Sequence, residues 1–333
     1  MSELRWHPFL EEWVITATHR QDRTFLPPKD YCPLCPTKPG GFPTEVPQDH
    51  YDIVVFENKF PSLRKDPPQP EVAATKVAPV QPAQGICEVV VYTSEHTTTL
   101  TNLPIIRIRN LLRVWQDRYQ ELGTHDYIKY VLIFENKGEA VGVTLHHPHG
   151  QIYAFPFIPP KIAKELRASA MYYQQNKQCL FCTTLEEEYR DGRRIVFESE
   201  KFVAFIPFFA RYPYEVYLAP KQHLASLNDF TTEDINDLAI VLKGLLVKYD
   251  LLFNLSMPYI MVIHQAPTDG KHYPDYHFHF EFYPPLRTAN RLKYLAGCES
   301  GAGNYINDTL AEEKAAELRK VGPGNIREVL KLG

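Results

Sequence analysis

The segment YVLIFEN (130–136), followed by HHPHGQIY (146–153), decides the fold of this chain. The first is an apolar run of strand length, and the second has polar side chains at alternate positions, as in a strand with two different faces. The same order returns later in the chain, where YIMVIHQAP (259–267) precedes HFHFEFY (277–283). A pair of strands that occurs twice predicts a duplicated unit.

The repetition extends upstream of these strands. In the first half, Cys32-Pro-Leu-Cys35 is followed by a strand candidate that leads to His96 and then by a helical stretch. In the second half, Cys179-Leu-Phe-Cys182 is followed by a strand that leads to His223 and by a helical stretch with an apolar stripe. We therefore predict an α+β fold of two tandem units, each an antiparallel sheet with a packed helix. The units would span residues 1–165 and 166–333.

The overall composition narrows the possible partners. The 333 residues include 36 basic and 40 acidic side chains, and this balance gives no basic surface for a nucleic acid. No segment reaches the roughly 20 apolar residues of a membrane helix. The N-terminal residues also lack the apolar stretch of a signal peptide. We expect a cytosolic protein without nucleic-acid or membrane partners, in which the thiols stay reduced.

Each unit contains the side chains of a tetrahedral zinc site. Cys-x-x-Cys supplies two thiolates from one tight turn, and two later histidines bring the number of ligands to four. The predicted sites are Cys32, Cys35, His96 and His147 in the first unit, and Cys179, Cys182, His223 and His277 in the second. We expect two Zn²⁺ ions per chain, both structural because protein side chains fill every position.

The alternative interpretations of the Cys-x-x-Cys pairs are two unrelated turns or a redox dithiol. Such a motif lies at the start of a helix that follows a strand, and neither pair is expected to begin a helix. The histidines that follow both pairs in the same order favour zinc.

His149 is the candidate nucleophile. Side chains alternate along a strand, so His147 can hold a metal while His149 and Gln151 face the same pocket. An imidazole can attack phosphorus when a hydrogen bond fixes its second nitrogen, and Gln151 can donate its amide to a phosphoryl oxygen. The residues alone leave two other roles open for His149, a further metal ligand or a packed strand histidine.

The string His147-Pro-His149-Gly-Gln151, preceded by Gly142-x-Thr144, resembles the active-site signature of the galactose-1-phosphate uridylyltransferases. These enzymes form the transferase branch of the histidine triad superfamily, and the hydrolase branch has a third histidine at the position of Gln151. The opening segment 5–23 and the later Phe282-Tyr-Pro-Pro285 follow in the family's order, so the resemblance covers nearly the whole chain.

The resemblance implies a ping-pong reaction. UDP-glucose would give its uridylyl group to His149 and release glucose 1-phosphate, and galactose 1-phosphate would then take the group up as UDP-galactose. Gln151 would stabilise the phosphoryl oxygens. The resemblance also implies a homodimer with residues of both chains in each active site. It places nucleotide contacts at Arg20, Arg23, Asn58 and Thr144, and hexose contacts at Lys293 and Glu299.

Some members of this family have another metal site, built from a glutamate and three histidines. The corresponding residues here are Glu165, His264, His279 and Glu281, so a carboxylate replaces one histidine. We favour a solvated helix face for Glu165 and a hydrogen-bonded strand histidine for His264. Base and sugar preference stay open, because Lys59 and Tyr305 also depart from the family pattern.

Two other functions fit parts of the sequence. A phosphorylase of the same superfamily branch would pass an adenylyl group from ADP-glucose or a dinucleoside polyphosphate through His149 to phosphate. Base preference distinguishes this enzyme from a uridylyltransferase. A non-enzymatic, zinc-organised nucleic-acid-binding protein is the more distant alternative, and the negative net charge argues against it.

Overall fold

The computed structural model describes residues 2–22 and 31–332. One nine-stranded sheet forms its centre, and every strand pair in it is antiparallel. The strands follow the spatial order β3 (Val54–Glu57), β5 (Ile86–Val91), β7 (His149–Phe155), β6 (Tyr130–Lys137), β11 (Tyr259–His264), β12 (His279–Tyr283), β10 (Val216–Pro220), β9 (Phe202–Phe205) and β8 (Ile195–Glu198).

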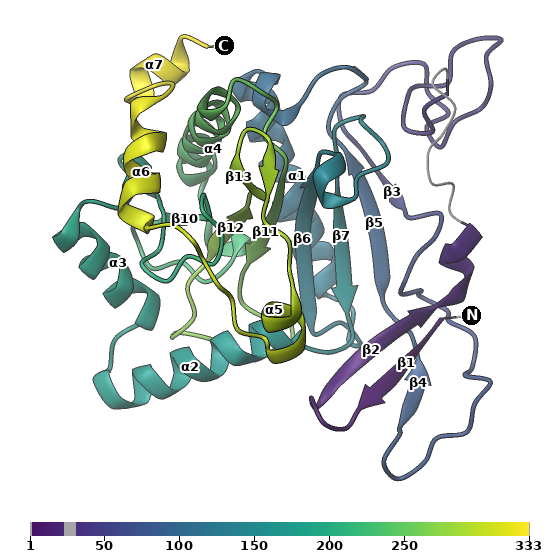
Figure 1. Ribbon diagram of the computed structural model, residues 1–333. Coiled ribbons are helices and arrows are strands. Elements are labelled where there is room, and N and C mark those ends of the chain that lie inside the picture. The colour runs from purple at the N-terminus through teal and green to yellow at the C-terminus, as the bar shows by residue number, and fades with distance from the viewer. Residues whose placement is uncertain (1, 23–30, 333) are drawn as a thin grey trace.

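The two predicted units share this sheet instead of forming one sheet each. β6 of the first unit pairs with β11 of the second, and the two strands lie side by side in the middle of the sheet (Figure 1). A separate unit would leave the outer edge of each of these strands with unpaired backbone groups. Pairing the two edges satisfies both, so the duplication produces one continuous sheet.

Two long helices cover one face of the sheet, α1 (Ile105–Gly123) and α4 (Thr232–Leu252). They pack against each other, and their buried residues belong to the same large apolar core as the strands beneath them. A capping box of Thr231 and Asp234 begins α4, as the sequence indicates. The other helices are α2 (Pro160–Asn176), α3 (Leu180–Asp191), α5 (Gly297–Ala302), α6 (Ala311–Lys320) and α7 (Ile326–Leu330).

Short elements complete the described structure. A three-stranded sheet joins β2 (Glu12–Ala17), β1 (Ser2–His7) and β4 (Val80–Pro82), and a small hairpin joins β13 (Leu286–Thr288) and β14 (Arg291–Leu292). The 3-10 turns are η1 (Thr18–Asp22), η2 (Leu100–Asn102), η3 (Glu139–Val141) and η4 (Leu227–Asp229).

α2 and α3 connect the two halves of the sheet. The boundary proposed at residue 165 falls inside α2. The expectation that neither cysteine pair begins a helix is wrong for the second pair, because Cys179 is the N-cap of α3. This helix follows α2 and not a strand, so the arrangement still differs from the strand–helix setting of a redox dithiol.

Alternation along β7 and β12 separates a core face from a polar face. Ile152, Phe280 and Phe282 join the core beneath α1 and α4, while His149 and Gln151 lie on the opposite side of the sheet, as predicted. Gly150, between these two residues, is packed so closely that a Cβ atom there would lie 2.2 Å from the hydroxyl oxygen of Tyr92. The backbone of the polar segment therefore lies directly against the core.

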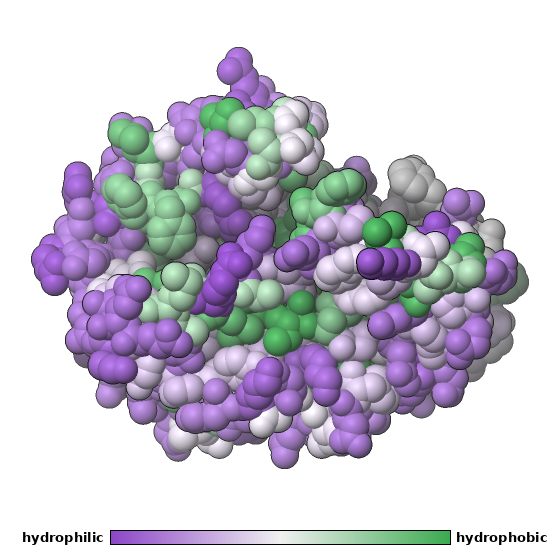
Figure 2. Space-filling view, turned by 90° about the horizontal axis from the view of Figure 1, so that it is seen from below, coloured by the Kyte–Doolittle hydropathy of each residue, from purple (hydrophilic) through white to green (hydrophobic). Residues whose placement is uncertain are grey.

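The face of the molecule in Figure 2 is mostly hydrophilic, with hydrophobic residues gathered near its middle. Among the described residues, no helix combines the length and the apolar character needed to cross a membrane.

Candidate active site

Five of the predicted site residues line one pocket of about 250 Å³. They come from separate parts of the first half of the chain. Arg20 lies in η1, Asn58 follows β3, Thr144 belongs to the loop before β7, and His149 and Gln151 lie on β7. Arg23, the remaining residue predicted to contact the nucleotide, lies outside the described residues.

The backbone fixes the tautomer of His149. Its Nδ1 lies 2.7 Å from the carbonyl oxygen of His147, and because a carbonyl can only accept, Nδ1 carries the proton. In the neutral ring, the lone pair is then on Nε2. This is the hydrogen bond that the sequence argument required of a nucleophilic imidazole.

Hydrogen bonds also order the polar wall beside His149. The Nδ2 amide of Asn58 donates to Oε1 of Gln151 at 3.4 Å, while its Oδ1 accepts from the backbone N–H of Phe60 at 2.9 Å. Arg20 donates to the carbonyl oxygen of Phe60 at 2.7 Å. With its oxygen engaged by Asn58, Gln151 retains its own amide group as a donor.

Apolar residues form another wall of the same pocket. The sequence analysis did not predict them as site residues. Phe56 of β3 pairs with Val89 of β5, which pairs with Gln151 of β7, so the three side chains lie in one row across the sheet. Leu34, inside the first Cys-x-x-Cys turn, lines the same pocket. The alternation within residues 51–60 is the signal that could have identified Phe56.

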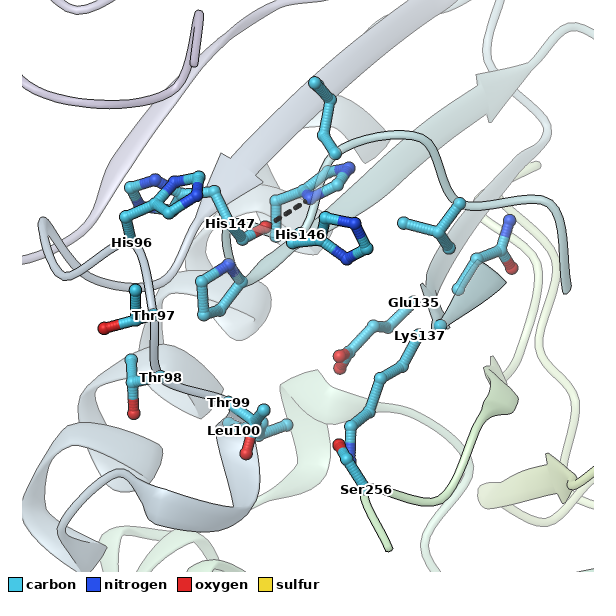
Figure 3. A pocket seen from close by; sticks show the side chains of 16 residues that line it. His96, Thr97, Thr98, Thr99, Leu100, Glu135, Lys137, His146, His147 and Ser256 are labelled. Carbon is cyan, nitrogen blue, oxygen red and sulfur yellow. Dashed lines mark hydrogen bonds between the residues drawn. The ribbon is translucent and has the colours of Figure 1, made fainter. Parts of the chain in front are cut away.

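His149 also lines a second pocket, on its other side. Glu135 and Lys137 of β6 lie together on one side of this pocket, and Thr97, Thr98 and Thr99 lie on the other (Figure 3). Glu135 is buried and accepts hydrogen bonds from the hydroxyls of Tyr92 at 3.4 Å and Tyr259 at 3.3 Å. Burial outweighs these bonds and raises the pKa of the Glu135 carboxyl to about 7.

We expect Glu135→Gln to change how stability depends on pH. The carboxyl has an ordinary pKa of 4.5 and a folded-state value of about 7, so the folded protein holds the proton more tightly. Stability is then lost as the pH rises from about 5 through about 7. The urea unfolding free energy of the variant, relative to the wild type, should rise by about 2–3 kcal/mol between pH 5 and pH 8. The exposed control Glu121→Gln should show the same pH dependence of the unfolding free energy as the wild type. If Glu135→Gln also paralleled the wild type, the raised pKa of Glu135 would be contradicted.

The structure brings together all four predicted ligands of the first metal site, with one ligand atom of each within 4.8 Å of the others. Cys35 Sγ lies 3.5 Å from Nδ1 of His96 and 3.6 Å from Nδ1 of His147. A tetrahedral zinc ion with its usual bond lengths would hold sulfur and nitrogen about 3.5 Å apart. His147 donates from Nε2 to the carbonyl oxygen of Thr93 at 2.6 Å, which leaves Nδ1 toward the sulfurs.

The structure brings together three of the four predicted ligands of the second metal site. Cys179, Cys182 and His223 have ligand atoms within 4.8 Å of one another, and Cys182 Sγ lies 3.5 Å from Nδ1 of His223. The ring of His277 is 5.3 Å from that of His223 at an angle of 87°, compared with 5.5 Å and 77° for His96 and His147. His277, the predicted fourth ligand, has no ring nitrogen within 4.8 Å of all three ligand atoms, and its Nε2 is buried without a hydrogen-bond partner among the described residues.

Lys293 and Glu299 do not lie with the other predicted substrate contacts. Neither is among the described residues that line the two pockets beside His149. They form a buried ion pair, with Nζ and Oε1 3.3 Å apart. Lys293 also donates to the carbonyl oxygen of Ile306. Within one chain, the structure therefore does not bring this pair to His149.

The expectation of a solvated helix face for Glu165 is wrong. Its Oε2 lies 2.8 Å from Nδ1 of His264 and accepts a hydrogen bond from the hydroxyl of Tyr276 at 2.9 Å. His264 is a hydrogen-bonded strand histidine, as expected. Glu165, His264, His279 and Glu281 form a third group whose ligand atoms lie within 4.8 Å of one another. The reason is tertiary, because α2 packs its polar side chains against the polar face of β11 and β12.

Comparisons with known proteins agree over nearly the full length. Residues 1–159 match the model of the galactose-1-phosphate uridyl transferase N-terminal domain, and residues 165–330 match that of the C-terminal domain. A galactose-1-phosphate uridylyltransferase from Thermotoga maritima is 44% identical over 323 residues, or 96% of this chain and 98% of the relative.

Solved structures give the same result. A uridylyltransferase structure has a TM-score of 0.86 at 36% identity, covering 96% of this chain and 97% of the other. An ADP-glucose phosphorylase from Arabidopsis thaliana is more distant, with a TM-score of 0.72 at 26% identity over 97% and 99% of the two chains. The fold and the matches to both halves define a nucleotidyltransferase. The chain belongs to the galactose-1-phosphate uridylyltransferase family.

Proposed function

We propose that this protein is a UDP-glucose–hexose-1-phosphate uridylyltransferase that works through a covalent uridylyl group on His149. One observation carries the proposal. The bond from His149 Nδ1 to the carbonyl oxygen of His147 leaves the lone pair on Nε2, at a pocket that also holds Gln151 and Arg20. The family supplies the reaction class, and this geometry supports His149 as the nucleophile.

The reaction would proceed by two displacements at phosphorus. Nε2 of His149 attacks the α-phosphorus of UDP-glucose, and the bond to the bridging oxygen breaks with release of glucose 1-phosphate. A phosphate oxygen of galactose 1-phosphate then attacks the same phosphorus, and His149 leaves as UDP-galactose forms. The His147 carbonyl oxygen accepts the hydrogen bond from Nδ1–H throughout, which stabilises the positive charge that the ring acquires on phosphorylation.

The remaining pocket residues suit the nucleotide. Gln151 donates its amide to a non-bridging oxygen of the transferring phosphoryl group, where charge accumulates. Arg20, Asn58 and Thr144 supply further polar groups around the phosphates or the ribose, and we keep Arg23 as a predicted contact. The planar uracil would lie against the apolar row that includes Phe56.

We expect Gln151→Glu to lower kcat for uridylyl transfer by about 10²–10³. The carboxylate has the same shape as the amide but lacks its donor, and it places a negative charge beside the phosphoryl oxygens. Steady-state kinetics of UDP-glucose consumption would measure the effect. Gln81→Glu, an exposed change on β4, is the matched control and should behave as the wild type. Unchanged kcat in the Gln151 variant would remove this residue from the mechanism.

Two structural zinc ions per chain are part of the proposal. The sulfur–nitrogen distances in the two groups support them. When bound, zinc would fix the two Cys-x-x-Cys turns to the sheet. The turn with Leu34 forms part of the pocket, so the first ion would shape the nucleotide site indirectly.

We further propose a homodimer. Lys293 and Glu299 are predicted to contact the hexose, yet within one chain they lie apart from the pockets beside His149. A second copy of the chain could supply them. A cytosolic location and the absence of a nucleic-acid partner stay predictions from the sequence.

The deciding experiment is incubation of the protein with UDP-glucose or, separately, with ADP-glucose, followed by intact-mass and peptide analysis. A uridylyl adduct on His149 that galactose 1-phosphate discharges would support the proposal. An adenylyl adduct discharged by inorganic phosphate would instead identify the phosphorylase. Folded protein that forms neither adduct would exclude His149 as the nucleophile.

A further inference from the structure

The second half of the sheet contains a counterpart of the His149 pocket. Tyr217 of β10 pairs with Phe205 of β9 and with Glu281 of β12, just as Val89 pairs with Phe56 and with Gln151 in the first half. His279 lies two residues before Glu281 and is bonded from Nδ1 to the carbonyl oxygen of His277 at 3.0 Å, as His149 is to that of His147. A cavity of about 420 Å³ opens beside these residues.

This counterpart cannot serve as a second transfer site. The ring of His279 stacks against those of Phe181 and Tyr217, with centroids 4.8 and 5.2 Å away. A carboxylate, Glu281, replaces the amide that Gln151 provides in the first half, and its side chain is fully buried. Both features exclude an anionic phosphoryl group from the position next to His279.

The groups around Glu281 have spacings that suit a metal ion. Nε2 of His264 lies 3.4 Å from Oε2 of Glu281, and Nε2 of His279 lies 3.6 Å from Oε1. Oε1 has no hydrogen-bond partner among the described residues. Glu165 contacts the other ring nitrogen of His264, Nδ1, through its Oε2. Ions with bonds of 2.0–2.2 Å to nitrogen and oxygen hold neighbouring ligands at similar spacings.

A cation of the protein itself already occupies this position. The Lys161 ammonium, on α2, donates to Oε2 of Glu281 and to the hydroxyl of Tyr283. The same ammonium lies 3.9 Å from Oε1 of Glu165, one helical turn along α2. Arg211 approaches Oε2 of Glu281 from the other side, at 3.6 Å. A divalent ion bound to Glu281 would have to displace Lys161 or sit against its positive charge.

We propose that Lys161 replaces a metal ion in the Glu165–His264–His279–Glu281 group. An ion pair then holds this group together, whereas zinc is proposed for the two cysteine-containing groups. The residues do not fit a bound divalent ion while Lys161 holds Glu281. The ion pair joins α2, which connects the two halves, to the polar face of β12. The cavity beside the group, which Lys161 itself lines, would admit an ion once the ammonium is removed.

The test is the metal content of purified full-length variants. Protein would be produced in medium with zinc, iron and manganese, separated from free metal by gel filtration, and analysed for metal ions per chain. Lys161→Met removes the charge and keeps a similar length. We expect this variant to hold about one more divalent ion per chain than the wild type, and the double variant with His264→Ala to lose that gain. His264→Ala alone should match the wild type.

The matched control is Lys164→Met, an exposed position on the same helix, which should leave the metal content unchanged. Lys161→Gln provides a second uncharged replacement in case the first does not fold, as judged by circular dichroism. The proposal fails if His264→Ala in the wild-type background loses about one ion, because the group is then a metal site despite Lys161. It also fails if neither folded Lys161 variant gains an ion. Since no substrate is involved, these outcomes are independent of uridylyl transfer.

Discussion

Replacing His149 with alanine is expected to lower the rate of uridylyl transfer by a factor on the order of 10⁶, the scale reached when a covalent nucleophile is removed. The methyl group cannot attack phosphorus, and the ring of the neighbouring His147 cannot take its place, because it is turned toward Cys32 and Cys35. The exchange of label between UDP-glucose and glucose 1-phosphate measures this step without the second substrate.

Two further measurements make the result specific to His149. The variant should still bind UDP-glucose, because the polar and apolar walls of the pocket remain. His272→Ala, an exposed histidine in the loop before β12, should keep wild-type exchange. If His149→Ala retained more than about a tenth of the wild-type exchange rate, which is a loss of less than 1.4 kcal/mol, a covalent role for this residue would be excluded.

Replacing Cys32 with serine is expected to remove about one zinc ion per chain and to abolish the cooperative unfolding transition. Structural zinc binds folded peptides with about 10–16 kcal/mol, whereas the net stability of a domain is only about 5–15 kcal/mol. The loss of one thiolate therefore removes free energy comparable with the whole stability. Metal analysis and thermal unfolding would measure the two effects together.

Cys298→Ser is the matched control, since Cys298 is a half-buried cysteine outside the candidate metal groups. It should retain the zinc content and the unfolding temperature of the wild type. A Cys32→Ser protein that kept its full zinc content and its unfolding transition would show that Cys32 is not a ligand.

Much of the fold follows from local sequence patterns. Polar alternation in 146–153 and 277–283 identified β7, β12 and their two faces, and the histidine spacing identified the duplication. The sequence did not reveal that the two halves share a single sheet. The mostly apolar residues of β6 and β11 suit a strand at the edge of a sheet as well as one at its centre. Pairing of their edges depends on backbone groups, which are the same in every sequence.

The candidate site likewise contains residues whose roles the sequence could predict and residues whose roles it could not. Residues close to one motif, such as His147, His149 and Gln151, could be assigned roles because a strand fixes their relative directions. Glu165 could not be assigned correctly, since its partner His264 lies 99 positions away in the chain. Lys161 gave no signal at all, because a lysine near the start of an amphipathic helix is ordinarily solvated.

The sequence by itself indicated the repeat and predicted two metal-ligand sets and a nucleophile, because each of these depends on residue identity and short-range spacing. Tertiary structure alone decided that the halves share one sheet, that Lys293 and Glu299 lie apart from His149, and that Lys161 closes the Glu281 group. The physical reason is that these outcomes depend on which strand edges and helix faces meet. Such contacts join residues that are far apart in the chain and leave no periodic pattern within it.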